Sequence, residues 1–65
     1  MQILVNGEPV ATDASTLAEL CAKLGFTEAK VATAVNGCFV ASAQRALTPL
    51  APKDEIEIVA PRQGG

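Results

Sequence analysis

Residues 16–25 read Thr-Leu-Ala-Glu-Leu-Cys-Ala-Lys-Leu-Gly, and this stretch predicts the helix around which the chain folds. Thr16 fits an N-cap, with Glu19 as the other half of a capping box, and Gly25 stands where a helix C′ glycine belongs. Four apolar residues recur at the spacing of one helical face, so we expect that face to pack on a core. They are Leu17, Leu20, Cys21 and Leu24.

A hairpin is predicted before this helix. Met1–Val5 and Glu8–Ala11 alternate as strands and flank Asn6-Gly7, a pair typical of tight hairpins because both residues tolerate positive φ. Pro9 has no N–H to donate to a neighbouring strand, so we expect the second strand at the edge of a sheet.

A second hairpin is predicted after the helix. Val31–Val35 is rich in β-branched residues, and Asn36-Gly37 joins it to a short strand that starts at Cys38–Val40. The segment that follows is irregular, and we expect Leu47 and Leu50 to anchor it to the core.

The last strand signal covers Asp54–Val59, where Ile56 and Ile58 are expected to point inward and the glutamates between them outward. Strands on both sides of a single helix predict an α+β fold, with the helix packed across one face of a mixed sheet. We expect one domain over residues 1–61 and a flexible tail over residues 62–65.

The composition restricts what the chain can do. Its 65 residues contain no His, Tyr or Trp, and the net charge is −2. Without His the chain lacks the side chain best suited to proton transfer near neutral pH, so we do not expect an enzyme. The charge is not that of a nucleic-acid binder, and no apolar run is long enough to span a membrane.

The sequence leaves one disulfide between the two cysteines open, but we expect both to be reduced and structural. Cys21 and Cys38 form no CxxC pair and have no His beside which to build a metal site, so no metal is predicted. We interpret both as buried thiols of a cytoplasmic protein, with Cys21 on the apolar helix face and Cys38 at a strand end or turn.

The sequence ends in Gly64-Gly65. Glycine lets the backbone enter a narrow channel, and the four residues after Pro61 extend at most about 13–14 Å. The α-carboxylate of Gly65 has a pKa of about 3.3–3.7, so it is an anion that needs activation, for instance as an acyl-adenylate, before a nucleophile attacks it. The end of the chain is therefore the candidate reactive group.

Several stretches of the chain resemble the ThiS family, the ubiquitin-like β-grasp sulfur carriers of thiamine biosynthesis. The resemblance spans nearly the whole chain, and its C-terminal part is the most specific. The stretches are Met1–Val5, Asn6-Gly7, Thr16–Leu20, Val35–Gly37 and Asp54–Gly65.

The resemblance implies that the carboxylate of Gly65 is adenylated and then converted to a thiocarboxylate. A ThiF-like adenylyltransferase would use ATP for the first step, and a cysteine desulfurase or another donor would supply sulfur. Thiazole synthase would then receive that sulfur. No intrinsically bound cofactor is implied, and Arg62, Gln63 and Gly64 would enter the partners' active sites with Gly65.

A partner interface is expected on the outer face of the sheet. Strand alternation places Leu4 and Val59 opposite the core, Phe39 is either core or interface, and Pro61 lies close to the tail. Arg62 either steers the tail toward an acidic entrance on a partner or is simply solvated. The acidic residues of the last strand are either solvated or contact a basic partner.

The sequence leaves other functions open and departs from the family pattern at two places. The small subunit of molybdopterin synthase or a related carrier would use the same chemistry, and a ubiquitin-like protein modifier would form an isopeptide bond instead. Ala41-Ser42 stands where the family often has a basic residue, and Lys53-Asp54 where it commonly has Gly-Asp. Both departures lie away from the tail.

Overall fold

The computed structural model describes residues 1–26 and 30–60. Five strands, one α-helix and one 3₁₀ helix follow one another along this part of the chain. They are β1 (Gln2–Val5), β2 (Glu8–Ala11), α1 (Leu17–Lys23), β3 (Ala32–Val35), β4 (Cys38–Val40), η1 (Ser42–Leu47) and β5 (Glu55–Val59).

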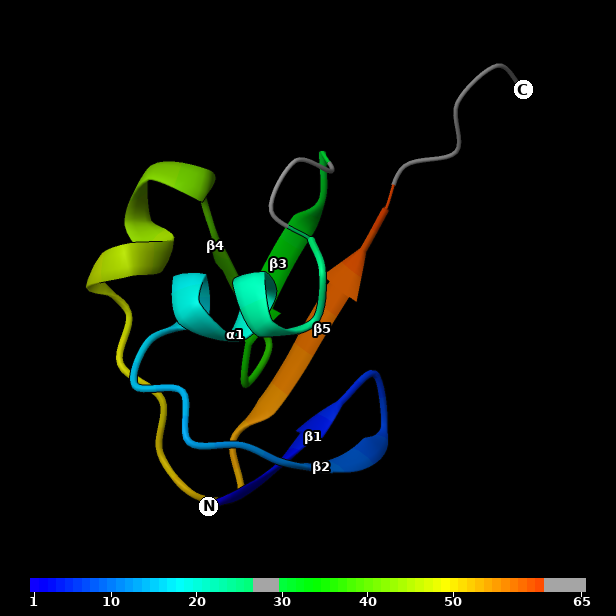
Figure 1. Cartoon of the computed structure of the whole chain (residues 1–65). Coiled ribbons are helices and arrows are strands. Elements are labelled where there is room, and N and C mark those ends of the chain that lie inside the picture. Colours follow the sequence, from blue (N-terminus) through cyan, green and yellow to red (C-terminus); the bar gives the residue numbers. More distant parts are fainter. Residues whose placement is uncertain (27–29, 61–65) are drawn as a thin grey trace.

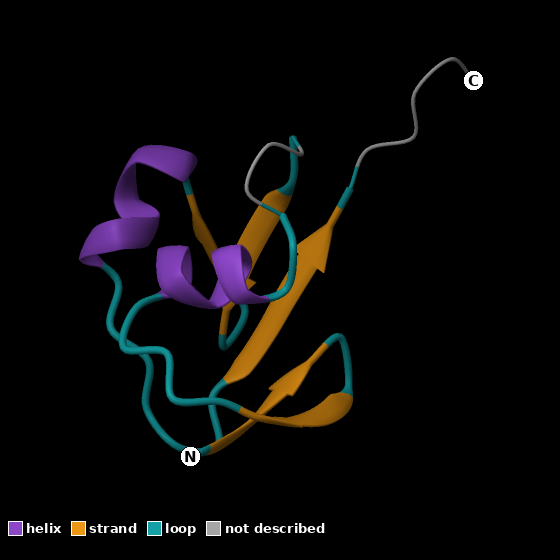
Figure 2. Cartoon of the chain, in the orientation of Figure 1, coloured by secondary structure: helices purple, strands orange, loops and turns teal. Residues whose placement is uncertain are grey.

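The strands form one sheet in the order β2-β1-β5-β3-β4. β1 and β5 run parallel, whereas the other neighbouring pairs are antiparallel, so the sheet is mixed. Figure 1 shows β5 running through the middle of the sheet, with α1 across one face. η1 lies beside α1 (Figure 2). The predicted α+β architecture is confirmed.

Both predicted hairpin turns are present. Asn6 and Asn36 each have φ 51°, and the glycines after them have φ 85° and 84°, which is the geometry of a type I′ turn. Pro9 lies on β2 and pairs with Leu4 of β1. β2 is an edge strand, as predicted.

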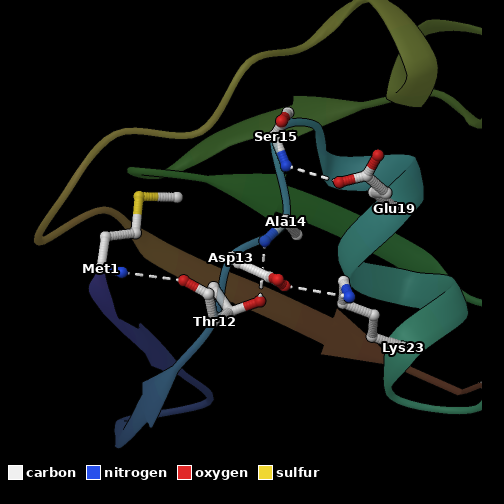
Figure 3. A network of polar contacts seen from close by, with 7 residues as sticks. All are labelled: Met1, Thr12, Asp13, Ala14, Ser15, Glu19 and Lys23. Atoms are coloured by element: carbon white, nitrogen blue, oxygen red, sulfur yellow. Dashed lines mark hydrogen bonds and ion pairs between the residues drawn. The ribbon is translucent and has the colours of Figure 1, made fainter.

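Polar contacts hold the link between β2 and α1 (Figure 3). The Thr16 hydroxyl accepts a hydrogen bond from the Glu19 N–H at 3.2 Å, which confirms the N-cap. The Glu19 carboxylate accepts from the N–H of Ser15 at 2.7 Å, one residue earlier than a capping box places it. The Lys23 ammonium lies 3.0 Å from the Asp13 carboxylate and joins the end of α1 back to the link.

The C-terminus of α1 closes in a Schellman motif. The N–H of Gly25, at φ 90°, donates to Ala22, and the N–H of Phe26 donates to the carbonyl of Cys21. The prediction that Leu24 shares the buried face is wrong, because α1 ends one residue before it. As the C-cap, Leu24 is 38% exposed.

The core lies between α1 and the inner face of the sheet. Both isoleucines of β5 are buried as predicted, and Leu50 packs against the core. Leu47 is 73% exposed, so its predicted anchoring role is wrong: η1, which ends at Leu47, buries none of its side chains. The buried apolar residues are Ile3, Ala14, Leu17, Leu20, Cys21, Ile56 and Ile58.

Within residues 1–26 and 30–60, no helix is long and apolar enough to cross a membrane.

Candidate functional site

The last strand connects the folded domain to the candidate reactive end of the chain. β5 pairs with β1 on one side and with β3 on the other, and it ends at Val59. Residues 61–65 lie outside the described residues, so the structure places neither the predicted tail nor Pro61 of the predicted interface. The residues concerned are Pro61, Arg62, Gln63, Gly64 and Gly65.

Phe39 and Val59 lie together on the outer face of the sheet, away from α1. Phe39 is 73% exposed and Val59 is 61% exposed, so Phe39 does not belong to the core. The register places Phe39 opposite Ala34 and Val59 opposite Ala32, and all four line one shallow hollow. We call these four residues the outer patch.

Leu4 does not join the outer patch. It is half-buried and lies opposite Glu55 at the start of β5, four residues before Val59. Four residues of strand span roughly 13 Å. Glu55 and Glu57, both exposed, lie along β5 between the two positions. The structure therefore brings together two of the predicted interface residues and leaves Leu4 apart.

Two asparagines that the sequence marks only as turn residues also bind β5. The Asn6 side chain donates from Nδ2 to the carbonyl of Ile58 and accepts the Ile58 N–H at Oδ1, both at 3.0 Å. The Asn36 side chain accepts the Glu55 N–H at 2.9 Å and donates to the Asp54 carboxylate at 3.0 Å. The Asn-Gly pairs signal the turns, but no local pattern signals these contacts.

The two cysteines have different environments, and both are free thiols. Cys21 is buried on the core-facing side of α1, as predicted. Burial raises the pKa of its thiol, so the reactive thiolate is disfavoured. Cys38 is exposed, so its predicted burial is wrong: β4 is an edge strand, and Cys38 is its first residue after the hairpin turn. In the described part of the chain, no group of three or more His, Cys, Asp or Glu side chains lies together as a metal site would require.

Comparison with known proteins identifies a family and a similar crystal structure. The model of the ThiS family matches residues 2–65. The crystal structure of the thiamine biosynthesis protein (ThiS) from Geobacter metallireducens is similar to this chain with a TM-score of 0.82 and 28% sequence identity, over 100% of both chains. This likeness confirms the β-grasp fold. No curated protein matches the chain significantly.

Proposed function

The chain belongs to the ThiS family, and on that premise we propose that it carries sulfur in thiamine biosynthesis on the carboxylate of Gly65. The observation that carries the proposal is the family match over residues 2–65, which includes the terminal Gly64-Gly65. A crystal structure of a thiamine biosynthesis protein, alike over the full length of both chains, supports it further.

The proposed chemistry starts from an ionised carboxylate. An oxygen of the Gly65 carboxylate attacks the α-phosphorus of ATP on a ThiF-like adenylyltransferase, which releases pyrophosphate and forms an acyl-adenylate. A persulfide from a cysteine desulfurase displaces AMP and forms an acyl disulfide, and a second thiol then cleaves the S–S bond, releasing the thiocarboxylate and leaving a disulfide. Hydrosulfide from another donor would displace AMP and give the thiocarboxylate directly. Thiazole synthase then takes the sulfur. Activation is needed because the carboxylate is an anion at neutral pH and a poor electrophile.

In this proposal the domain is a co-substrate, and the partner enzymes supply the catalytic groups. The chain contains no His, and burial makes Cys21 a poor nucleophile. The domain's own tasks are to fold, to be recognised and to present its end. A reducing cytoplasm suits both the thiocarboxylate and the two free thiols.

The outer patch is the proposed docking surface for these partners. Exposed apolar side chains that share one face are typical of protein interfaces, and Val59 lies only two residues before Pro61. A partner that covers Phe39 and Val59 therefore has the tail within reach. Leu4 would contribute a second, separate contact.

The carrier function is tested by intact mass. We expect incubation with ATP, a ThiF-like enzyme and a sulfur donor to add the mass difference between one sulfur and one oxygen. Deletion of Gly65 should abolish this gain and leave the unfolding midpoint unchanged, because the tail is proposed to lie outside the core. No gain in the full-length chain contradicts the proposal.

The choice of pathway and of docking surface needs two further measurements. Capture of thiazole synthase supports the thiamine pathway, whereas capture of a molybdopterin synthase large subunit, or an isopeptide bond to lysine, supports an alternative. Phe39→Ala should raise the KM of adenylation about tenfold, as loss of a central interface aromatic does. Leu47→Ala is the matched control, since both side chains are 73% exposed, and an equal effect of the two variants would contradict docking at the outer patch.

A further inference from the structure

The pairing between β1 and β5 ends before β5 does. The parallel register runs from Leu4 opposite Glu55 to Val5 opposite Ile56. The N–H of Asn6 then donates to the carbonyl of Ile56 at 2.8 Å, and the chain turns away. β5 continues to Val59, so its last residues have no strand of the β1 hairpin beside them.

The side chain of Asn6 fills the place that β1 leaves. In a continued parallel ladder, the next backbone groups of β1 would bond to the N–H and C=O of Ile58. The Asn6 carboxamide has the donor and the acceptor of a peptide group, and it makes both bonds at 3.0 Å. It acts as one further peptide unit of β1.

As a result, the end of β5 is held from both sides. Ile58 is bonded toward Asn6, while Val59 pairs with Ala32 of β3 on the opposite side. Pro61 follows three residues after Ile58. The contact that fixes Ile58 therefore fixes the base from which the tail starts.

We propose that Asn6 is a positioning residue for the reaction at Gly65, because its carboxamide aligns the end of β5 and so the direction in which the last residues reach a partner's active site. This inference rests on the proposed function. Alignment matters because adenylation requires the carboxylate in line with the α-phosphorus, and small errors of position are costly to the rate of such a step.

Asn36 provides a matched control within the same chain. It occupies the first position of the same type of turn, with the same φ of 51°. Its carboxamide also binds β5, but at the start of the strand, through Glu55 and Asp54. Loss of this contact should affect stability without changing the direction of the tail.

The test compares Asn6→Gly with Asn36→Gly in the full chain. Glycine adopts the positive φ of the turn, so each variant loses the carboxamide and keeps a type I′ turn. In steady-state adenylation, we expect Asn6→Gly to lower kcat about tenfold with little change in KM, whereas Asn36→Gly stays within about twofold of the parent chain. An equal loss of kcat in both variants, or none in Asn6→Gly, overturns the inference.

Amide hydrogen exchange on the isolated protein gives a readout that does not depend on the proposed function. Exchange at Ile58, whose N–H is bonded to Asn6, should be faster in Asn6→Gly and unchanged in Asn36→Gly. If the parent chain is not adenylated at all, the proposed function fails, and this pattern alone decides whether Asn6 aligns the strand end. Should Asn6→Gly not fold, Asn6→Asp keeps the acceptor for the Ile58 N–H and loses the donor, and the same pattern is expected to a smaller degree.

Discussion

Thr33 offers a sharp test of what joins β3, β4 and η1. Its side chain is only 1% exposed, and its hydroxyl donates to the carbonyl of Val40 at 2.7 Å. The same oxygen accepts from Nε of Arg45 at 3.0 Å, and Nη2 of Arg45 donates to the carbonyl of Val31 at 2.6 Å. One hydroxyl therefore links two strands to the helical segment that follows them.

Thr33→Val keeps the shape of the side chain and removes both bonds of the hydroxyl. A neutral hydrogen bond contributes about 0.5–1.5 kcal/mol and one to a charged group about 1.5–3 kcal/mol, while the added methyl returns about 0.8 kcal/mol. We expect a net loss of about 1–4 kcal/mol. A domain of 65 residues has roughly 3–10 kcal/mol in total, so the loss is a large fraction of its stability.

Urea unfolding followed by circular dichroism measures this loss, and Thr48→Val is the control. The Thr48 hydroxyl donates to the carbonyl of Gln44 at 2.7 Å in an exposed setting, so its removal should cost less than about 0.5 kcal/mol. A double-mutant cycle with Arg45→Met should give a coupling of about 1 kcal/mol with Thr33. A loss below about 0.5 kcal/mol for Thr33→Val, or an equal loss in the control, would refute the reasoning.

Three further predictions concern the thiols, a turn and an ion pair. Iodoacetamide should add once to the native protein, at Cys38, and twice after unfolding, because Cys21 is buried and the pKa of its thiol is raised. Intact mass counts the adducts, and two adducts on the native protein would contradict the burial of Cys21. Lys53→Gly should raise the free energy of unfolding by about 0.5 kcal/mol in urea, because Lys53 has φ 71°, and the absence of any gain would mean that the turn holds lysine without strain. The hydrogen bond from Lys23 lowers the pKa of Asp13, so its stabilisation is present above the unfolded pKa of about 3.9 and is lost as the pH falls through the folded value. Asp13→Asn should therefore lower the urea midpoint at pH 7, and this effect should shrink as the pH falls below about 3.9. An effect that does not change with pH would exclude this ion pair as the cause.

The elements that the sequence predicts well are those with a local signal. Thr16 and Gly25 mark the two ends of α1 because capping depends on neighbours three or four residues away. Ile56 and Ile58 are buried as predicted because strand alternation assigns a face as soon as the strand is recognised. Pro9 identifies its edge strand because it lacks the N–H that an inner strand needs.

The features that the sequence leaves open depend on contacts far along the chain. The sequence predicts Leu47 as an anchor, yet Arg45 and Leu50 are the side chains of its segment that contact β3 and the core. Phe39 is undecided from sequence until the register of β4 against β3 sets its face. The position of the tail beyond Ala60 stays a prediction, since residues 61–65 lie outside those described.

The two Asn-Gly pairs combine both cases, and they bear on how this domain presents its end. A type I′ turn accepts Gly as readily as Asn at its first position, so the turns alone do not require asparagine. The contacts with β5 do require asparagine, because a carboxamide supplies both a donor and an acceptor. Asn6 uses them at Ile58, 52 residues away, and Asn36 uses them at the start of the same strand. β5 carries two core isoleucines and one residue of the outer patch, and it leads to Gly65. Loss of either carboxamide would therefore leave the hairpins intact. Loss at Asn36 would weaken the start of β5 and lower stability, whereas loss at Asn6 would release the end of β5, on which the proposed chemistry depends.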